Sequence, residues 1–274
     1  MDLTSDFDRF ERAAWEGAVE AYRVGFGPLT NEVAARLLTA LALPPGVQLL
    51  DVACGPGDLA GAAEARGFSA TALDFAEGML EIARRRYPGV NFRCGDAHAL
   101  PFPDRTFAGV AMNFGVLHLS DPLRAFREGY RVLKPGGRYA FTAWEPPERS
   151  RGFEVIVGAI AAAGDPQVHL PPGPPFFKYG DPATARLELA AAGFAAVSTE
   201  RIELMWKLSS PTVFFETFLR GTARTGAVLR AQNPAQLAAI ERAVQSRLQP
   251  WMRNGGIELP MGVVLTTGER PVSS

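Results

Sequence analysis

Between residues 48 and 144, short apolar runs alternate with amphipathic segments that end at glycine or proline. The apolar runs, which we predict to be strands, cover 48–53, 69–74, 90–94, 107–113 and 138–144. The segments between them predict helices at 58–66, 76–86 and 122–133, and a Lys-Pro-Gly-Gly turn at 134–137. Strands that alternate with helices of roughly 10–15 residues are typical of a parallel, doubly wound sheet.

Outside this region the alternation is less regular. Residues 1–28 are aromatic-rich and predict one helix and a loop, after which Thr30 is expected to cap the next helix. Prolines cluster in 146–180, around an expected helix at 153–163. A helix and strand follow within 182–204, then helices at 211–222 and 234–253 and a last strand at 262–267. We therefore expect one domain over 1–274, with its core at 30–145, 181–205 and 258–270 and a lid from 1–28, 146–180 and 206–257.

The charge balance argues against a nucleic-acid partner. Lys and Arg number 28 against 29 Asp and Glu, for a net charge of −1, whereas proteins that hold long nucleic acids usually carry a basic excess. The N-terminus is acidic, so no secretory signal is expected, and no apolar run is long enough for a membrane span. Cys54 and Cys94 match no metal or redox spacing, so we expect buried side chains and a cytoplasmic protein.

The first predicted strand leads into a turn that contains Gly55 and Gly57. Glycine lets the backbone approach a ligand closely, and the free N–H groups of the following helix face it. The spacing Gly55-x-Gly57-x-x-Ala60, with Asp74 further on, also fits the looser dinucleotide fingerprint. By itself the turn is therefore compatible with a nicotinamide or flavin, with S-adenosylmethionine, or with a tight turn that needs glycine only for its conformation.

Three further motifs follow in order: LDFAEGML at 73–80, GDAHALPF at 95–102 and LKPGG at 133–137. The ordered set resembles the class I S-adenosylmethionine-dependent methyltransferases over about residues 30–145. It is most similar to their small-molecule branch of the ubiquinone- and menaquinone-biosynthesis type. The resemblance implies an α/β, Rossmann-like doubly wound sheet of seven strands, mostly parallel with the last strand antiparallel, and an inserted helical lid.

The resemblance also implies which residues hold S-adenosyl-L-methionine. Asp51 can reach its amino group, Asp74 its ribose hydroxyls and Asp96 its adenine amino group. The full set is Asp51, Ala53, Gly55, Gly57, Asp74, Phe75, Met79, Asp96, Ala97 and Asn113, mostly at the carboxyl ends of strands, where open α/β sheets bind ligands. Ala53 and Asp58 stand where the family has glycine, and we expect Asp58 to point outward as a helix cap.

Histidine is the candidate for acid–base chemistry. His118 follows the fourth predicted strand, where it could take a proton from a substrate hydroxyl or serve only to orient a substrate or cap a helix. His98 and His169 are expected at the surface. Three histidines so widely dispersed predict no metal site.

Aromatic side chains concentrate outside the predicted core. They form either the lid's own packing or the wall of an apolar pocket over the transferred methyl group. The residues expected to contact a substrate are Trp15, Tyr22, Phe26, His118, Phe176 and Phe177. This pocket predicts a lipophilic or aromatic small molecule. Enzymes that methylate amines of nucleic-acid bases resemble one another in an Asn/Asp-Pro-Pro-aromatic run after strand four, and here the run is Asn-Phe-Gly-Val, which again argues against DNA or RNA.

The predicted function is in-line transfer of a methyl group from S-adenosyl-L-methionine to oxygen, carbon or nitrogen of a small acceptor, with S-adenosyl-L-homocysteine as product. Proximity and alignment supply most of the rate, because the donor is already activated. One alternative is a non-methylating member that keeps the cofactor as a structural or electrostatic element. A nicotinamide-dependent oxidoreductase is a second alternative, which nothing beyond the glycine turn supports.

Overall fold

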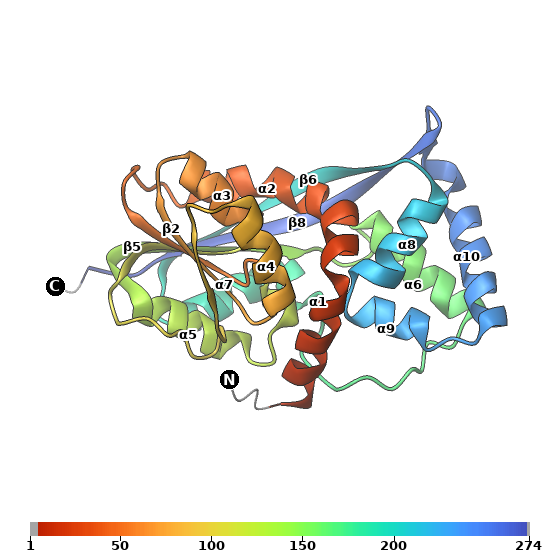
Figure 1. The fold of residues 1–274 in the computed structure, drawn as a ribbon, viewed down its shortest axis with the longest axis horizontal. Helices are drawn as coiled ribbons and strands as arrows, with labels where there is room; N and C mark the ends of the chain where they lie inside the picture. Colours follow the sequence, from red (N-terminus) through yellow and green to blue (C-terminus); the bar gives the residue numbers. More distant parts are fainter. Residues whose placement is uncertain (1–4, 273–274) are drawn as a thin grey trace.

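The computed structural model of the protein describes residues 5–272 and has a twisted sheet at its centre (Figure 1). The strands are β1 Gln48–Val52, β2 Ser69–Asp74, β3 Asn91–Cys94, β4 Phe107–Met112, β5 Leu133–Trp144, β6 Ala195–Leu208, β7 Met252–Arg253 and β8 Gly256–Glu269. Seven of them form one path in the order β3-β2-β1-β4-β5-β8-β6, and the short β7 pairs with β8. Neighbours from β3 to β5 are parallel, whereas β8 is antiparallel to β5 and β6. The predicted fold class is confirmed.

Helices pack on the sheet and also form a second group beside it. They are α1 Asp6–Gly25, α2 Gly27–Ala40, α3 Asp58–Ala65, α4 Glu77–Arg86, α5 Pro122–Val132, α6 Arg151–Ala163, α7 Pro182–Ala191, α8 Pro211–Gly221, α9 Arg224–Arg230 and α10 Pro234–Leu248. In Figure 1, α2 and α3 lie on one side of the sheet and α5 and α7 on the other. Helices α6, α8, α9 and α10 gather at the far end of β6 and β8, and α1 runs between this group and the sheet.

The first helices differ from the sequence-based prediction. Residue Thr30 is not a helix cap, because α2 already begins at Gly27 with Phe26 as its N-cap. Pro28 occupies the first turn, where its missing N–H is tolerated and its fixed φ suits the helix. The Thr30 hydroxyl instead donates back to the Gly27 carbonyl at 3.1 Å. The predicted cap of α5 is confirmed, since the Asp121 side chain accepts from the Arg124 N–H at 3.1 Å.

The expected turn at 134–137 is part of β5. Pairing with β4 jumps from Phe107↔Leu133 to Gly109↔Arg138, so the segment between these pairs bulges out of the ladder. Gly136 has a φ of +75°, and its N–H donates to the carbonyl of Arg270 at 2.8 Å. The carbonyl of Arg270, which is distant in the sequence, therefore stabilises this bulge within the strand. The local Lys-Pro-Gly-Gly pattern contains no sign of this partner, so it predicted a turn instead.

The C-terminal strands are much longer than predicted. β6 and β8 pair from Ala195↔Glu269 to Leu208↔Ile257, and they extend beyond the rest of the sheet to reach the second helix group. The structure also contains α9, which was not predicted, and α10 ends at Leu248, before the expected end at 253. The chain segment 206–257 is thus joined to the sheet through these two strands, and segment 146–180 contacts β8 through the bridge between Ser150 and Met261.

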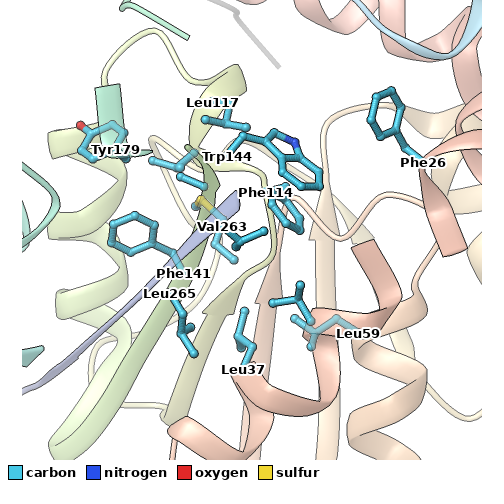
Figure 2. Close-up of a cluster of buried hydrophobic side chains, with 14 of the residues drawn as sticks. Phe26, Leu37, Leu59, Phe114, Leu117, Phe141, Trp144, Tyr179, Val263 and Leu265 are labelled. Carbon is cyan, nitrogen blue, oxygen red and sulfur yellow. The ribbon is translucent and has the colours of Figure 1, made fainter. Parts of the chain in front are cut away.

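Apolar side chains fill the space between sheet and helices (Figure 2). Phe114 and Trp144 stack with ring centroids 4.1 Å apart, at the end of the sheet where β4 and β5 finish. The Cys54 side chain is buried as expected, but Cys94 is exposed, so that prediction was wrong; both are free thiols. Among residues 5–272, no helix is both long and apolar enough to cross a bilayer.

Candidate functional site

An open cavity lies at the carboxyl ends of β1, β2 and β4. Its floor comes from the strand ends, and its walls come from α1, the start of α2, residues 144–176 and the α8–α9 junction. A smaller adjoining hollow shares Ala53, Asp74, Phe75 and His118 with it.

The glycine turn brings the backbone to the cavity edge. Gly55 has a φ of +51°, and a side chain there would meet nothing within 4 Å, so this residue faces open space. Gly57 has a φ of +84° and caps α3, but a Cβ there would come within 2.9 Å of the Phe92 ring. Gly55 therefore borders the cavity, whereas Gly57 is required for close packing behind it and does not line the cavity.

Asp51 is the most unusual polar group of the site. The side chain is buried at the end of β1, and neither carboxylate oxygen has a hydrogen-bond partner among the described residues. Burial and the nearby charge of Asp74 raise the pKa of Asp51 well above its ordinary value, although the nearby Ala60 N–H, which makes no hydrogen bond of good geometry with it, opposes the shift. A buried carboxyl group without partners is strongly disfavoured. The residue lines the cavity, so a donor group of a bound molecule would satisfy it.

Asp74 links the second strand to the glycine turn. Its Oδ2 accepts from the Gly55 N–H at 2.8 Å, and its Oδ1 accepts from the Ala76 N–H at 2.9 Å. Burial raises the pKa of Asp74 to about 6, although these backbone hydrogen bonds oppose the shift. Each carboxylate oxygen keeps a second acceptor site. Phe75 and Met79, which follow Asp74 along the chain, also line the cavity.

Asp96 and Ala97 line the smaller hollow. The Asp96 Oδ1 accepts from the His98 N–H at 2.8 Å and lies 2.8 Å from His98 Nδ1. Burial alone would raise the pKa of Asp96, but the hydrogen bonds from His98 outweigh it and hold that pKa below its ordinary value. His98 was expected in solvent and is instead buried, with its Nε2 accepting from the Asp121 N–H. It fixes one oxygen of Asp96 and leaves the other available.

Asp58 is not the outward-pointing cap that the sequence suggested. Gly57 holds the cap position, and the Asp58 carboxylate is bound by both terminal nitrogens of Arg86, at 2.5 and 3.0 Å. The Tyr87 hydroxyl donates to the same carboxylate at 2.8 Å. The negative charge that replaces a glycine of the motif is therefore paired with a cation at the cavity edge.

Asn113 is held on both sides of its amide group. Its Nδ2 donates to the Thr30 carbonyl at 3.1 Å, and its Oδ1 accepts from the Thr142 hydroxyl at 2.7 Å. These bonds connect the end of β4 to α2 and β5. Asn113 lines the cavity as expected, but both polar atoms of its side chain already make hydrogen bonds to other residues of the protein.

The other end of the cavity is aromatic. Trp15, Tyr22, Phe26 and Phe176 line it, as the sequence suggested, and so does His118. Phe177 does not line it; its ring packs on Phe153 and Phe176, with centroid distances of 5.2 and 4.9 Å. Sequence reasoning missed several lining residues: Phe114, Trp144, Phe153 and the 221–225 segment. Phe114 directly follows Asn113, a predicted site residue, so its position in the sequence could have predicted that it lines the cavity.

His118 contacts a residue that was not singled out from the sequence. The His118 Nδ1 lies 3.0 Å from Oε2 of Glu11, on α1. Glu11 is fully buried and also accepts from the Trp15 indole N–H at 3.2 Å. Glu11 and His118 are 107 positions apart, and no local pattern joins them.

Residues 50–141 match the protein family described as a methyltransferase domain. The chain is 39% identical over 111 residues to a demethylmenaquinone methyltransferase of Renibacterium salmoninarum, an alignment that covers 40% of this chain and 47% of that protein. It is 40% identical over 116 residues to a 2-phytyl-1,4-naphtoquinone methyltransferase of Thermosynechococcus vestitus, covering 40% of this chain and 52% of the relative. The chain thus spans about half the length of the curated relatives it matches.

Among solved structures, phosphoethanolamine N-methyltransferase 2 of Haemonchus contortus, in complex with S-adenosyl-L-methionine, superposes with a TM-score of 0.59. The two chains are 20% identical, and the alignment covers 98% of this chain and 60% of that one. At this identity the likeness concerns the fold, which agrees with the sheet order described above.

Proposed function

We propose that this chain is a class I, S-adenosylmethionine-dependent methyltransferase that transfers a methyl group to a small, lipophilic aromatic acceptor, and the match of residues 50–141 to a methyltransferase domain supports the proposal. The observation that carries the proposal is the two-sided cavity. One end holds the partnerless carboxyl group of Asp51 beside the open backbone of Gly55, and the other end is walled by aromatic rings. A cavity with one polar end and one apolar end suits two different molecules, a polar cofactor and an apolar acceptor.

The residues at the polar end fit S-adenosyl-L-methionine. The oxygens of Asp51 need a donor, which the cofactor's cationic amino group provides. Asp74 offers its remaining acceptor sites to the ribose hydroxyls, and Asp96 its free oxygen to the adenine amino group. Met79 adds soft apolar surface beside the adenine. When bound, the cofactor supplies a methyl group that is already activated on a sulfonium.

The chain's own contribution is to position the acceptor, exclude water and accept a proton. Trp15, Phe114 and Phe176 wall the acceptor's space, which leaves a ring little freedom of orientation. Among the described residues that line the cavity, His118 is the only histidine, and its Nε2 has no hydrogen-bond partner among them. We propose that Nε2 of His118 takes up the proton that an acidic group of the acceptor molecule releases.

A naphthoquinone-type ring in its reduced form is the acceptor class that we favour. The names of the relatives from Renibacterium and Thermosynechococcus support it, as does the aromatic wall.

We further propose that the segments 1–28, 146–180 and 206–257 act as a lid. The support is that α1, Phe176 and residues 221–225, one from each segment, border the same cavity. A cytoplasmic location is also part of the proposal, because both cysteines are free thiols.

The alternatives raised by the sequence are not favoured. A nicotinamide-dependent oxidoreductase had only the glycine turn in its support, and the match over residues 50–141 is to a methyltransferase domain. A protein that keeps the cofactor without transferring its methyl group finds no support in the relatives, which are methyltransferases by name.

The experiment is a mass-spectrometric assay with S-adenosylmethionine and naphthalene-1,4-diol under anaerobic conditions. We expect S-adenosylhomocysteine and a product heavier by one CH₂ to accumulate in equal amounts. S-adenosylhomocysteine without a methylated product would contradict the proposed acceptor class. A diol that remains unchanged in the presence of bound cofactor would contradict it as well.

A further inference from the structure

Glu11 is a buried carboxyl group with an incomplete set of partners. It lies on α1 with 0% of its surface exposed. Its Oε2 lies 3.0 Å from His118 Nδ1 and accepts from the Trp15 indole N–H at 3.2 Å, whereas Oε1 has no hydrogen-bond partner among the described residues. Both partners of Oε2, His118 and Trp15, line the cavity, so Glu11 lies directly behind its wall.

This arrangement determines which nitrogen of His118 carries the hydrogen. With Glu11 ionised, its carboxylate can only accept, and this assigns the hydrogen of a neutral imidazole to Nδ1. Nε2 is then left with a free lone pair, and no described residue hydrogen-bonds to it. The Trp15 ring packs edge-on against the imidazole at a centroid distance of 4.9 Å, which restricts its rotation. A proton acceptor in this state is held ready beside the cavity.

We propose that Glu11 is a positioning residue that holds His118 as an Nε2 base, and that the acceptor is therefore a weak acid of the phenol or enol type. This inference rests on the proposed function and specifies the acceptor of the same site. An acceptor that is a neutral amine or a carboxylate has no proton to lose before methyl transfer. The pair of Glu11 and His118 would therefore not be needed as a base for those acceptors.

The proton step balances within the site. The acceptor O–H bond breaks, its proton moves to Nε2 of His118, and the electron pair stays on the acceptor as an oxyanion conjugated with its ring. At oxygen, that pair itself forms the bond to the methyl carbon. At ring carbon, the conjugated ring pair forms the bond, and the hydrogen of that carbon is then lost to solvent as a proton while the oxygen regains a proton, which restores the aromatic ring. In both cases the pair of the breaking C–S bond stays on sulfur. The imidazolium that results faces the Glu11 carboxylate at 3.0 Å, which stabilises the new positive charge. His118 later returns the proton to solvent.

A purely structural role for Glu11 would be to attach α1 to the rest of the domain. Other residues of α1 already make such contacts. The Asp8 Oδ2 accepts from the Ser120 hydroxyl at 2.8 Å. The Glu16 carboxylate accepts from the backbone N–H groups of Glu77 and Gly78, at 2.9 and 2.7 Å, at the start of α4. Glu16 thus offers a matched control, because it is the same residue type on the same helix and it anchors α1 without touching His118.

The deciding experiment is ¹⁵N NMR of the full chain labelled in histidine. The sequence has 3 histidines, and His118→Gln identifies the signals of interest. At about pH 8, where an ordinary imidazole is neutral, we expect wild type and Glu16→Gln to show a protonated Nδ1 and a bare Nε2 for His118. Glu11→Met, which keeps the side-chain length but removes the acceptor, should shift His118 toward the Nε2–H form. Glu11→Gln, which keeps an acceptor oxygen, should retain the Nδ1–H form and covers the case in which the methionine variant does not fold.

Two further readouts separate this inference from the proposed function. Binding of S-adenosylhomocysteine, measured by calorimetry, should be equal in wild type, Glu11→Met and Glu16→Gln; if wild type does not bind it, the proposed function fails, whatever the NMR shows. Turnover of naphthalene-1,4-diol should fall about ten- to hundredfold in Glu11→Met alone. An Nε2–H tautomer in wild type, or wild-type turnover by Glu11→Met, would overturn the assignment of Glu11. Normal binding of S-adenosylhomocysteine with no turnover of the diol by wild type would overturn the acceptor class.

Discussion

The polar and aromatic ends of the cavity are built in different ways. At the polar end, Asp51, Gly55 and Asp74 lie within 24 consecutive residues, and the Asp74 carboxylate accepts from the backbone N–H of Gly55 at 2.8 Å. At the aromatic end, the wall comes from α1, from residues 144–176 and from the α8–α9 junction. The first end is a product of strand and turn geometry, whereas the second exists only once distant segments have packed together. Substitutions at the two ends should therefore affect different ligands.

The largest effect should come from Asp74→Ala. Loss of two hydrogen bonds to a charged acceptor should weaken binding of S-adenosylmethionine by roughly 2–4 kcal/mol, since the same carboxylate also holds the Gly55 turn. Calorimetric titration measures the change. Asp104→Ala, at an exposed carboxylate that lines neither the cavity nor the adjoining hollow, is the control and should bind normally. Unchanged affinity in the Asp74 variant would mean that this end of β2 does not contact the cofactor.

A related effect concerns stability against pH. The native pKa of Asp74 is about 6, against an ordinary value of 3.8, so the native state holds its proton to a higher pH than the unfolded chain does. The contribution of Asp74 to the unfolding free energy of the ligand-free protein should therefore fall as pH rises from about 4 to about 6, by about 3 kcal/mol, and change little above that range. Urea unfolding at several pH values tests this, and Asp74→Asn should flatten the slope. A stability that rises over this range in the wild type, with the same rise in Asp74→Asn, would contradict the assignment.

At the acceptor end, His118→Gln should lower kcat for the diol about a hundredfold, because the proton acceptor is lost. Cofactor affinity should stay the same, since none of the polar contacts of Asp51 or Asp74 involves this residue. Steady-state kinetics supplies the comparison, with His169→Gln at an exposed position as control. A fall of less than about threefold would leave His118 as a residue that only orients the acceptor.

The smallest effect should distinguish two neighbouring phenylalanines. Phe176 lines the cavity, whereas Phe177 packs behind it on Phe153. Phe176→Ala should raise the KM for the diol about five- to tenfold, equivalent to roughly 1–2 kcal/mol of lost aromatic contact, and leave cofactor binding unchanged. Phe177→Ala should change KM less. Equal effects in both variants would mean that the segment acts only through its packing.

The difference between local geometry and long-range packing also explains which parts of the fold could be predicted from the sequence. The bounds of β1 to β4 agree with the prediction within a residue, because their signal lies in local hydrophobic runs and turns. The start of α2 was missed because Pro28 outweighs Thr30 as a starting signal. The bulge at 134–137 was taken for a turn because its partner, Arg270, is more than 130 residues away. Long-range pairing overrides local propensity in such places.

The candidate site divides along the same line. The cofactor residues could be listed from motifs, although the motifs gave no sign that Asp58 would be neutralised by Arg86 or that Asn113 would be fully hydrogen-bonded. For the aromatic end, residue type indicated Trp15, Tyr22 and Phe176. It did not indicate Glu11, because an acidic residue in a helix ordinarily lies on the solvent side. Only the docking of α1 against His118 buries it.

If the polar end of the cavity binds S-adenosylmethionine, Asp51 accepts a hydrogen bond from its amino group. Calorimetric titration of the purified protein with S-adenosylmethionine tests this, with NAD⁺ as the comparison ligand and Asp51→Asn as the variant. We predict saturable binding of S-adenosylmethionine to the wild type, markedly weaker binding to Asp51→Asn, and no binding of NAD⁺. Absence of S-adenosylmethionine binding at millimolar concentrations, or a preference for NAD⁺, would contradict the account.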